Sequence, residues 1–173
     1  MTSRFTRWFD QKYGAPRQKQ DWVKCHLMCG VKTNVVTAVE IHDMHAADSP
    51  QLPALVDATA KSFTIREVSL DKGYSSGENH DAIAKHKATP YIAFKNNTTG
   101  SVGGLFEKMF HFFSLNRDEF LRHYHKRSNV ESTFSMIILH AARNETSSNS
   151  WKLSVMSDAS LAACVVGTPS NTS

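Results

Sequence analysis

The order of strand-like and helix-like segments constrains the fold of this chain more than any other feature of its sequence. Residues 22–29 alternate between apolar and other side chains, a pattern that predicts a strand. A short turn through Gly30 leads into residues 34–41, which are rich in β-branched side chains, so we expect the two segments to pair as an antiparallel hairpin. The first recognisable unit is therefore a β-hairpin.

Helix-like and strand-like segments then alternate along the chain. Apolar residues at helical spacing predict a helix over 49–62, and the next apolar run predicts a strand over 65–70. The remaining expected elements are a helix at 77–87, a strand at 90–95, a helix at 105–113 and a last helical region at 117–139 that bends near Ser128. The order β-β-α-β-α-β followed by helices predicts an α/β fold, with a sheet flanked by helices.

The composition fits one globular domain with a mild preference for polyanions. The chain has 173 residues, 40% of them hydrophobic and 21% charged, which is enough for one apolar core. Its net charge of +4 favours partners such as nucleic acid. No run of about eighteen apolar residues predicts a membrane helix, and the N-terminus does not resemble a signal peptide. Because the three cysteines suggest no disulfide framework, we expect a reducing, cytoplasmic location.

The last part of the sequence has a different composition. Beyond residue 137 the helical pattern gives way to stretches rich in serine, asparagine and threonine, as in 144–150 and 167–173. Few side chains in such stretches can be buried, so we expect residues 138–173 to form a divergent, disordered tail. Residues 1–137 are then expected to form the folded domain.

Three side chains between Tyr124 and Glu131 form the clearest candidate site. At about 3.6 residues per helical turn, Tyr124, Arg127 and Glu131 share one face of a helix. Glu131 could hold a cation, Arg127 could bind a phosphate through two hydrogen bonds, and Tyr124 could donate a further one. The plainer alternative is a solvated charged face with one Arg127–Glu131 pair, which contributes about 0.2–0.5 kcal/mol.

Two motifs together carry a family resemblance. The first is Asp71-Lys72-Gly73-Tyr74 at the end of an expected strand, and the second is Tyr124-x-x-Arg127-x-x-x-Glu131 on the last helical region. Supporting segments are 4–9, 21–24, 30–34 and 123–136. From about residue 3 to residue 137 the chain resembles the DDE-type transposases of bacterial insertion sequences. The first motif alone is a weak signal, whereas the combination is specific.

The resemblance implies an RNase H-like fold and a metal-dependent reaction on DNA. In this family three carboxylates hold two divalent cations, and Asp71 matches the second carboxylate while Glu131 matches the third. Both are therefore expected to be catalytic metal ligands, and Mg2+ is the expected cation because it prefers oxygen ligands. Tyr124, Lys126 and Arg127 are expected to contact phosphate. The implied partners are DNA that carries insertion-sequence terminal repeats and a second copy of the chain.

The sequence departs from the family pattern in two places. The family's first catalytic aspartate lies on a central strand upstream of segment 4–9, and the chain begins at Met1 without room for that strand. Asp10 and Asp21 are poor substitutes, because one lies in a loop-like stretch and the other just before a strand. A family lysine is replaced by Ile138 where the resemblance ends, which a frameshift would explain. Translation of the other frames downstream should then recover a basic helical continuation.

Loss of the central strand is expected to weaken the sheet. Both neighbouring strands would lose ladder partners, and each unpaired backbone group that stays buried costs about 1–3 kcal/mol. Either residues 35–41 and 65–70 pair again, or residues 1–10 fill the gap, or the chain is marginally stable; we favour the last. The expected function is DNA transposition by metal-dependent strand cleavage and transfer, in an incomplete or inactive fragment. The alternatives are a non-catalytic DNA-binding remnant and an RNase H-like nuclease.

Two further segments have a structural explanation beside a functional one. The basic and aromatic segment 1–20 could stack on DNA bases or simply cover the core. Zinc could be held by His42, Asp43, His45 and Asp48, although we favour a polar loop that leads into a helix.

Overall fold

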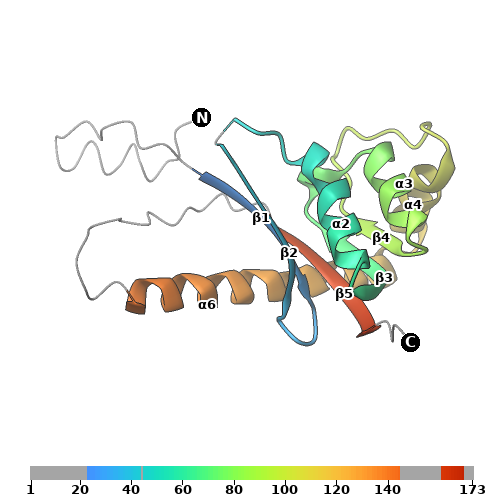
Figure 1. Ribbon diagram of the computed structural model, residues 1–173. Coiled ribbons are helices and arrows are strands. Elements are labelled where there is room, and N and C mark those ends of the chain that lie inside the picture. Colours follow the sequence, from blue (N-terminus) through green and yellow to red (C-terminus); the bar gives the residue numbers. More distant parts are fainter. Residues whose placement is uncertain (1–22, 44, 145–160, 170–173) are drawn as a thin grey trace.

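The computed structural model describes residues 23–43, 45–144 and 161–169 (Figure 1). Its elements are β1 (Val23–Gly30), β2 (Val36–Asp43), η1 (Ser49–Gln51), α2 (Leu52–Ala60), β3 (Phe63–Leu70), η2 (Lys72–Tyr74), α3 (Gly77–Lys85), β4 (Thr89–Ile92), α4 (Gly104–Leu115), α5 (Arg117–Tyr124), η3 (His125–Arg127), α6 (Ser128–Asn144) and β5 (Leu161–Pro169), where η denotes a short 3₁₀ helix. The strands and helices predicted up to residue 139 are present within a few residues of their expected bounds. The α/β class is therefore confirmed.

All five strands of the described chain form one mixed sheet in the order β2-β1-β5-β3-β4. The predicted hairpin is present, since β1 and β2 pair antiparallel. Strand β5, drawn in red in Figure 1, runs parallel to β1 and antiparallel to β3. Its residue Ala163 lies opposite Cys29 on one side and Ser69 on the other. The central position of the sheet is thus filled from the end of the chain.

This strand corrects one expectation and bears on a second. We predicted a disordered tail over 138–173, but Leu161–Pro169 forms a strand. We also predicted that the family's first strand is missing; β5 is a different segment that takes the central position, so that absence stays a prediction. The predicted boundary at residue 137 also falls inside α6. The apolar run at 161–166 is short and lies among serine-rich stretches. We judged the whole region by its average composition, and therefore did not predict a strand there. Pairing with β1 and β3 stabilises it, because each strand would otherwise carry unpaired backbone groups in the middle of a sheet.

Successive side chains of β1 point to opposite faces of the sheet, and each face has its own core. Met28 packs on one side in a core with Leu55 of α2 and Val68 of β3. Leu27 and its neighbour Cys29 face the other side, where Val130 of α6 covers them. Figure 1 shows α2 and α3 on one side of the strands and the long helix α6 on the other. Each side of the sheet is therefore covered by helices that come from a different part of the chain.

Helices α4 and α5 add a third, aromatic core next to β4. Its buried residues are Tyr91, Phe94, Phe106, Met109 and Phe120. The rings of Phe94 and Phe106 meet edge to face with centroids 5.2 Å apart, a favourable aromatic geometry. None of the helices in the described ranges is long and apolar enough to cross a membrane.

The last helical region is divided into three pieces. The 3₁₀ helix η3 separates α5 from α6, which confirms the irregularity that we expected near Ser128. Tyr124, Arg127 and Glu131 therefore belong to α5, η3 and α6 respectively, and not to one straight helix.

Substitution of Ala163 by proline tests the central position of β5. Proline lacks the N–H group, so Ala163→Pro should lose a ladder hydrogen bond at the centre of the sheet and lower the melting temperature. The matched control is Ala163→Gly, which keeps the N–H group and should cost only about 0.5–1 kcal/mol. Equal melting temperatures for the two variants, followed by circular dichroism, would mean that β5 does not occupy this position.

The stability of the fold should also fall in mild acid. His80 is fully buried against Phe94 and Phe106, and burial lowers its pKa in the folded state. The unfolded chain then binds more protons than the folded chain once the pH falls to about 6.5, so the unfolding free energy decreases by up to about 1.4 kcal/mol per pH unit for this group. Urea unfolding at pH 7.5 and 5.5 measures the loss. His80→Asn should show a weaker pH dependence than the wild type, and an unchanged dependence would contradict the assignment.

Candidate functional site

Asp71 lies directly beyond the end of β3, where a buried tyrosine anchors the motif. Its backbone is extended, and its Oδ1 accepts a hydrogen bond of 2.9 Å from the backbone N–H of Lys72, which caps η2. Tyr74 is fully buried, and its hydroxyl lies 2.8 Å from Nδ1 of the buried His26 on β1. Burial of Tyr74 therefore holds the short turn that carries Asp71 at the end of the strand.

The helical residues of the candidate site remain together in spite of the break at η3. The Arg127 guanidinium carbon lies 5.0 Å from the centre of the Tyr124 ring, which is cation–π distance. Arg127 Nη1 lies 3.4 Å from Glu131 Oε1, a weak pair because the Glu131 side chain is 55% exposed. The face predicted from helical spacing is thus preserved across the irregular turn.

Tyr124 connects this group to Asp71. Burial is the main cause that raises the pKa of Tyr124, Arg127 opposes the rise, and Asp71 adds to it. Both side chains are therefore close enough to the Tyr124 hydroxyl to shift its pKa. A protonated phenol can donate to a carboxylate, so Tyr124 suits a position between these two groups. Asp71 and Glu131 are therefore linked through Tyr124 and Arg127.

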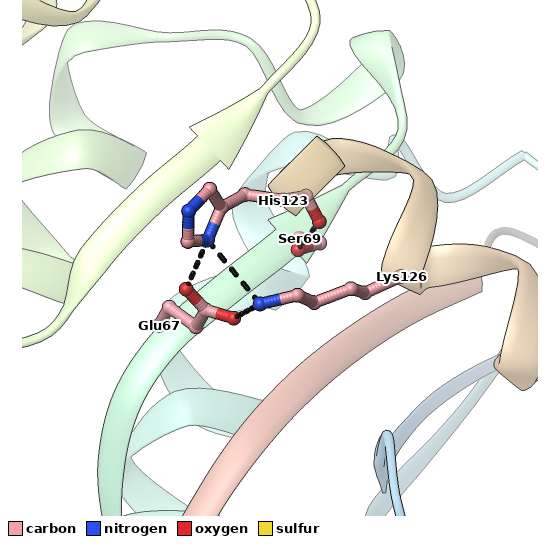
Figure 2. Close-up of polar contacts among 4 residues, drawn as sticks. All are labelled: Glu67, Ser69, His123 and Lys126. Atoms are coloured by element: carbon pink, nitrogen blue, oxygen red, sulfur yellow. Dashed lines mark hydrogen bonds and ion pairs between the residues drawn. The ribbon is translucent and has the colours of Figure 1, made fainter. Parts of the chain in front are cut away.

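Lys126, by contrast, points into a different set of contacts, shown in Figure 2. Its Nζ forms an ion pair with the carboxylate of Glu67 on β3. The other oxygen of Glu67 lies 2.6 Å from His123 Nδ1. The Ser69 hydroxyl donates a 2.9 Å hydrogen bond to the backbone oxygen of His123. We call these four residues the Glu67 cluster.

The Glu67 cluster was not predicted from the sequence. The signal for it was a carboxylate and a serine at alternate positions of an expected strand, which places both on one face of the sheet. Polar side chains on that face need partners, and the break between α5 and α6 supplies them. The partners themselves could not be read from the sequence, because they lie more than fifty residues away along the chain.

Helix α6 is positioned by contacts on the side away from Glu131. The Asn129 side chain donates a hydrogen bond to the Val31 carbonyl oxygen, in the turn between β1 and β2. Val130 is fully buried, and Thr133 Oγ1 lies 3.7 Å from Cys29 Sγ. These contacts hold the start of α6 against the sheet and leave Glu131 exposed.

The residues that the structure describes do not complete a two-cation site. Within the described ranges, no group of three His, Cys, Asp or Glu side chains lies close enough together to hold a metal ion, and this applies also to the zinc alternative around His42 and Asp48. Asp71 and Glu131 offer two carboxylates, but the central strand β5 reads LAACVVGTP and contains no acidic residue. Asp10 and Asp21 lie outside the described residues. Among the described residues, Asp71 and Glu131 thus remain the expected matches for two of the three carboxylates that the resemblance implies.

Neutral substitutions at the two carboxylates should leave the fold intact. Asn caps a helix as well as Asp, and the exposed Arg127–Glu131 pair contributes about 0.2–0.5 kcal/mol, so Asp71→Asn and Glu131→Gln should each shift the melting temperature by no more than about 2 °C. Thermal unfolding checks this. A large loss of stability in either variant would show that the carboxylate has a structural role.

Comparison with known proteins identifies the family. No curated protein and no solved structure matches the chain. A family model described as the transposase DDE domain matches residues 2–153, which continues past residue 137, where we expected the resemblance to end. Because this match covers most of the chain and includes both motifs, the protein belongs to the transposase DDE domain family.

Proposed function

We propose that the protein acts in DNA transposition, by binding DNA at the ends of an insertion sequence. The observation that carries this proposal is the group of Tyr124, Arg127 and Glu131, in which Arg127 contacts both of the others and Asp71 acts on the pKa of Tyr124, in a chain of the transposase DDE family. These residues come from the end of β3 and from three consecutive helical pieces, which supports a shared site for the two motifs.

The four residues suit different tasks in this proposal. Asp71 and Glu131 would be ligands of Mg2+, which supplies Lewis-acid stabilisation of charge on phosphate oxygens when it is bound. Arg127 would bind a phosphate in a bidentate manner, and Tyr124 would hydrogen-bond to it. Lys126 would add a further phosphate contact, subject to its pairing with Glu67. The RNase H-like arrangement, the terminal repeats as ligand and action as a homodimer are parts of the same proposal.

For the chain alone we propose binding without efficient strand cleavage. Two carboxylates are a poor substitute for three in fixing two cations, and the central strand offers no third one. DNA binding without efficient cleavage is what both the DNA-binding remnant and the inactive transposase fragment would show. A nuclease that acts on RNA–DNA hybrids is the remaining alternative, and no contact among the described residues favours it over transposition.

Removal of the Arg127 charge should weaken DNA binding and reduce the dependence of the DNA affinity on salt concentration. Each phosphate contact contributes about 0.9 to the slope of log affinity against log salt, so Arg127→Gln should lower that slope by about this amount. Fluorescence anisotropy with a duplex that carries the terminal repeats flanking the gene, between 50 and 300 mM KCl (roughly the range over which such slopes are measured), gives the slope. The matched control is Lys61→Gln, an exposed residue after α2 on the other side of the sheet, which should leave the slope unchanged.

The same samples test the reaction. With Mg2+ and the repeat-bearing duplex, we expect DNA binding with little or no strand transfer by the chain alone. Efficient transfer that is lost in Asp71→Asn would show that a complete catalytic site exists, with its third carboxylate outside the described residues. Cleavage of generic RNA–DNA hybrids would instead favour the nuclease, and absence of any DNA binding would overturn the proposal.

A further inference from the structure

Glu67 holds two basic side chains, His123 and Lys126, on the face of the sheet that carries the candidate site. Its side chain is only 12% exposed, and its two oxygens meet His123 and Lys126 separately (Figure 2). A mostly buried carboxylate needs such partners, because an unpaired charge at this depth would be costly. Lys126 is thus engaged by a residue of its own chain in the absence of DNA.

Glu67 is too far from Asp71 to act as the missing metal ligand. The two residues are four positions apart on extended backbone, so their Cα atoms are separated by about 13 Å at the usual rise of a strand. The cations of a two-metal site lie about 3.5–4 Å apart, and their shared ligands must converge on that scale. Glu67 therefore has a role other than ligation alongside Asp71.

The cluster has one partner that is held firmly and one that can leave. The His123 ring stacks on Tyr91 with centroids 4.3 Å apart and planes 8° apart, and the Ser69 hydroxyl holds the His123 backbone oxygen. Lys126 has no such stack. Its Nζ also lies 3.3 Å from His123 Nδ1, but its side chain is 36% exposed and its flexible stem carries a compact charge. If Lys126 swings outward, Glu67 keeps His123 as its hydrogen-bond partner. Release of Lys126 therefore does not leave Glu67 without a partner.

Lys126 lies next to Arg127 in η3. If Lys126 separates from Glu67, it can therefore bind the same DNA backbone as Arg127, the proposed phosphate-binding residue. We propose that Glu67 is an internal competitor for DNA phosphate: its carboxylate holds Lys126, and DNA gains the Lys126 contact only by displacing Glu67. Glu67 thereby sets the strength and the salt dependence of DNA binding. The inference rests on the proposed DNA-binding function.

A double-mutant cycle tests the competition. Glu67→Gln keeps the size of the side chain and removes its charge, so Lys126 should become free to bind phosphate. Anisotropy with the same duplex should then show a slope steeper by about 0.9 and, near 0.1 M KCl, an affinity higher by about threefold to tenfold. In the Lys126→Gln background, the substitution at Glu67 should give no such gain.

The control separates this effect from a general change of charge. Glu119→Gln removes one negative charge from an exposed position on α5, for which no ion pair is present in the described part of the chain. The gain in Glu67→Gln should exceed that in Glu119→Gln. Equal gains in these two variants, or a gain that persists in the Glu67→Gln/Lys126→Gln double variant, would overturn the inference while leaving DNA binding established.

A measurement on the wild-type chain avoids dependence on the folding of the variants. Acetylation of lysine amines, followed by mass spectrometry, should be slower at Lys126 than at Lys108, an exposed lysine on α4. Equal rates would mean that Glu67 does not hold Lys126 in solution, and the inference would fail. If neither the wild type nor any variant binds DNA, the proposed function fails, and the inference fails with it.

Discussion

The backbone pairing of β5 with β1 and β3 is the constraint on which the rest of the structure depends. Without it, the β1–β2 hairpin and the parallel pair β3–β4 would be two separate small sheets. Unpaired N–H and C=O groups would then line the middle of the fold, where helices on both sides exclude water. Strand β5 joins the β1–β2 hairpin and the β3–β4 pair into one continuous sheet.

One consequence of this sheet concerns the candidate site. Asp71 follows β3, whereas Glu131 lies on α6, and α6 packs through Val130 against β1. The distance between β1 and β3 therefore controls the relation between the two carboxylates. The strand that sets this distance, β5, has no acidic residue. It therefore joins the sheet without adding a carboxylate to Asp71 and Glu131.

A second consequence concerns the break between α5 and α6. Ser69 and Glu67 on β3 bind the end of α5 and the turn that follows it, through His123 and Lys126. These contacts hold η3 over β3, which ends directly before Asp71, and so bring Tyr124 and Arg127 near that residue. Lys126 and Arg127 both pair with carboxylates of the same chain, Glu67 and Glu131. This pairing reduces the net positive charge that the turn presents to DNA.

The sequence by itself determined the local elements, because alternation in β1 and helical spacing in α2 are properties of neighbouring residues. It also determined that Tyr124, Arg127 and Glu131 lie together, since short-range spacing keeps them in contact. The tertiary structure alone decided which strand takes the central position and which residue holds Lys126. Both outcomes join residues far apart in the chain: β5 meets β3, and Glu67 meets Lys126, through pairing that satisfies backbone groups or charges. Such long-range partners leave no periodic signal, because they are selected by the unpaired groups that remain after the local elements have formed.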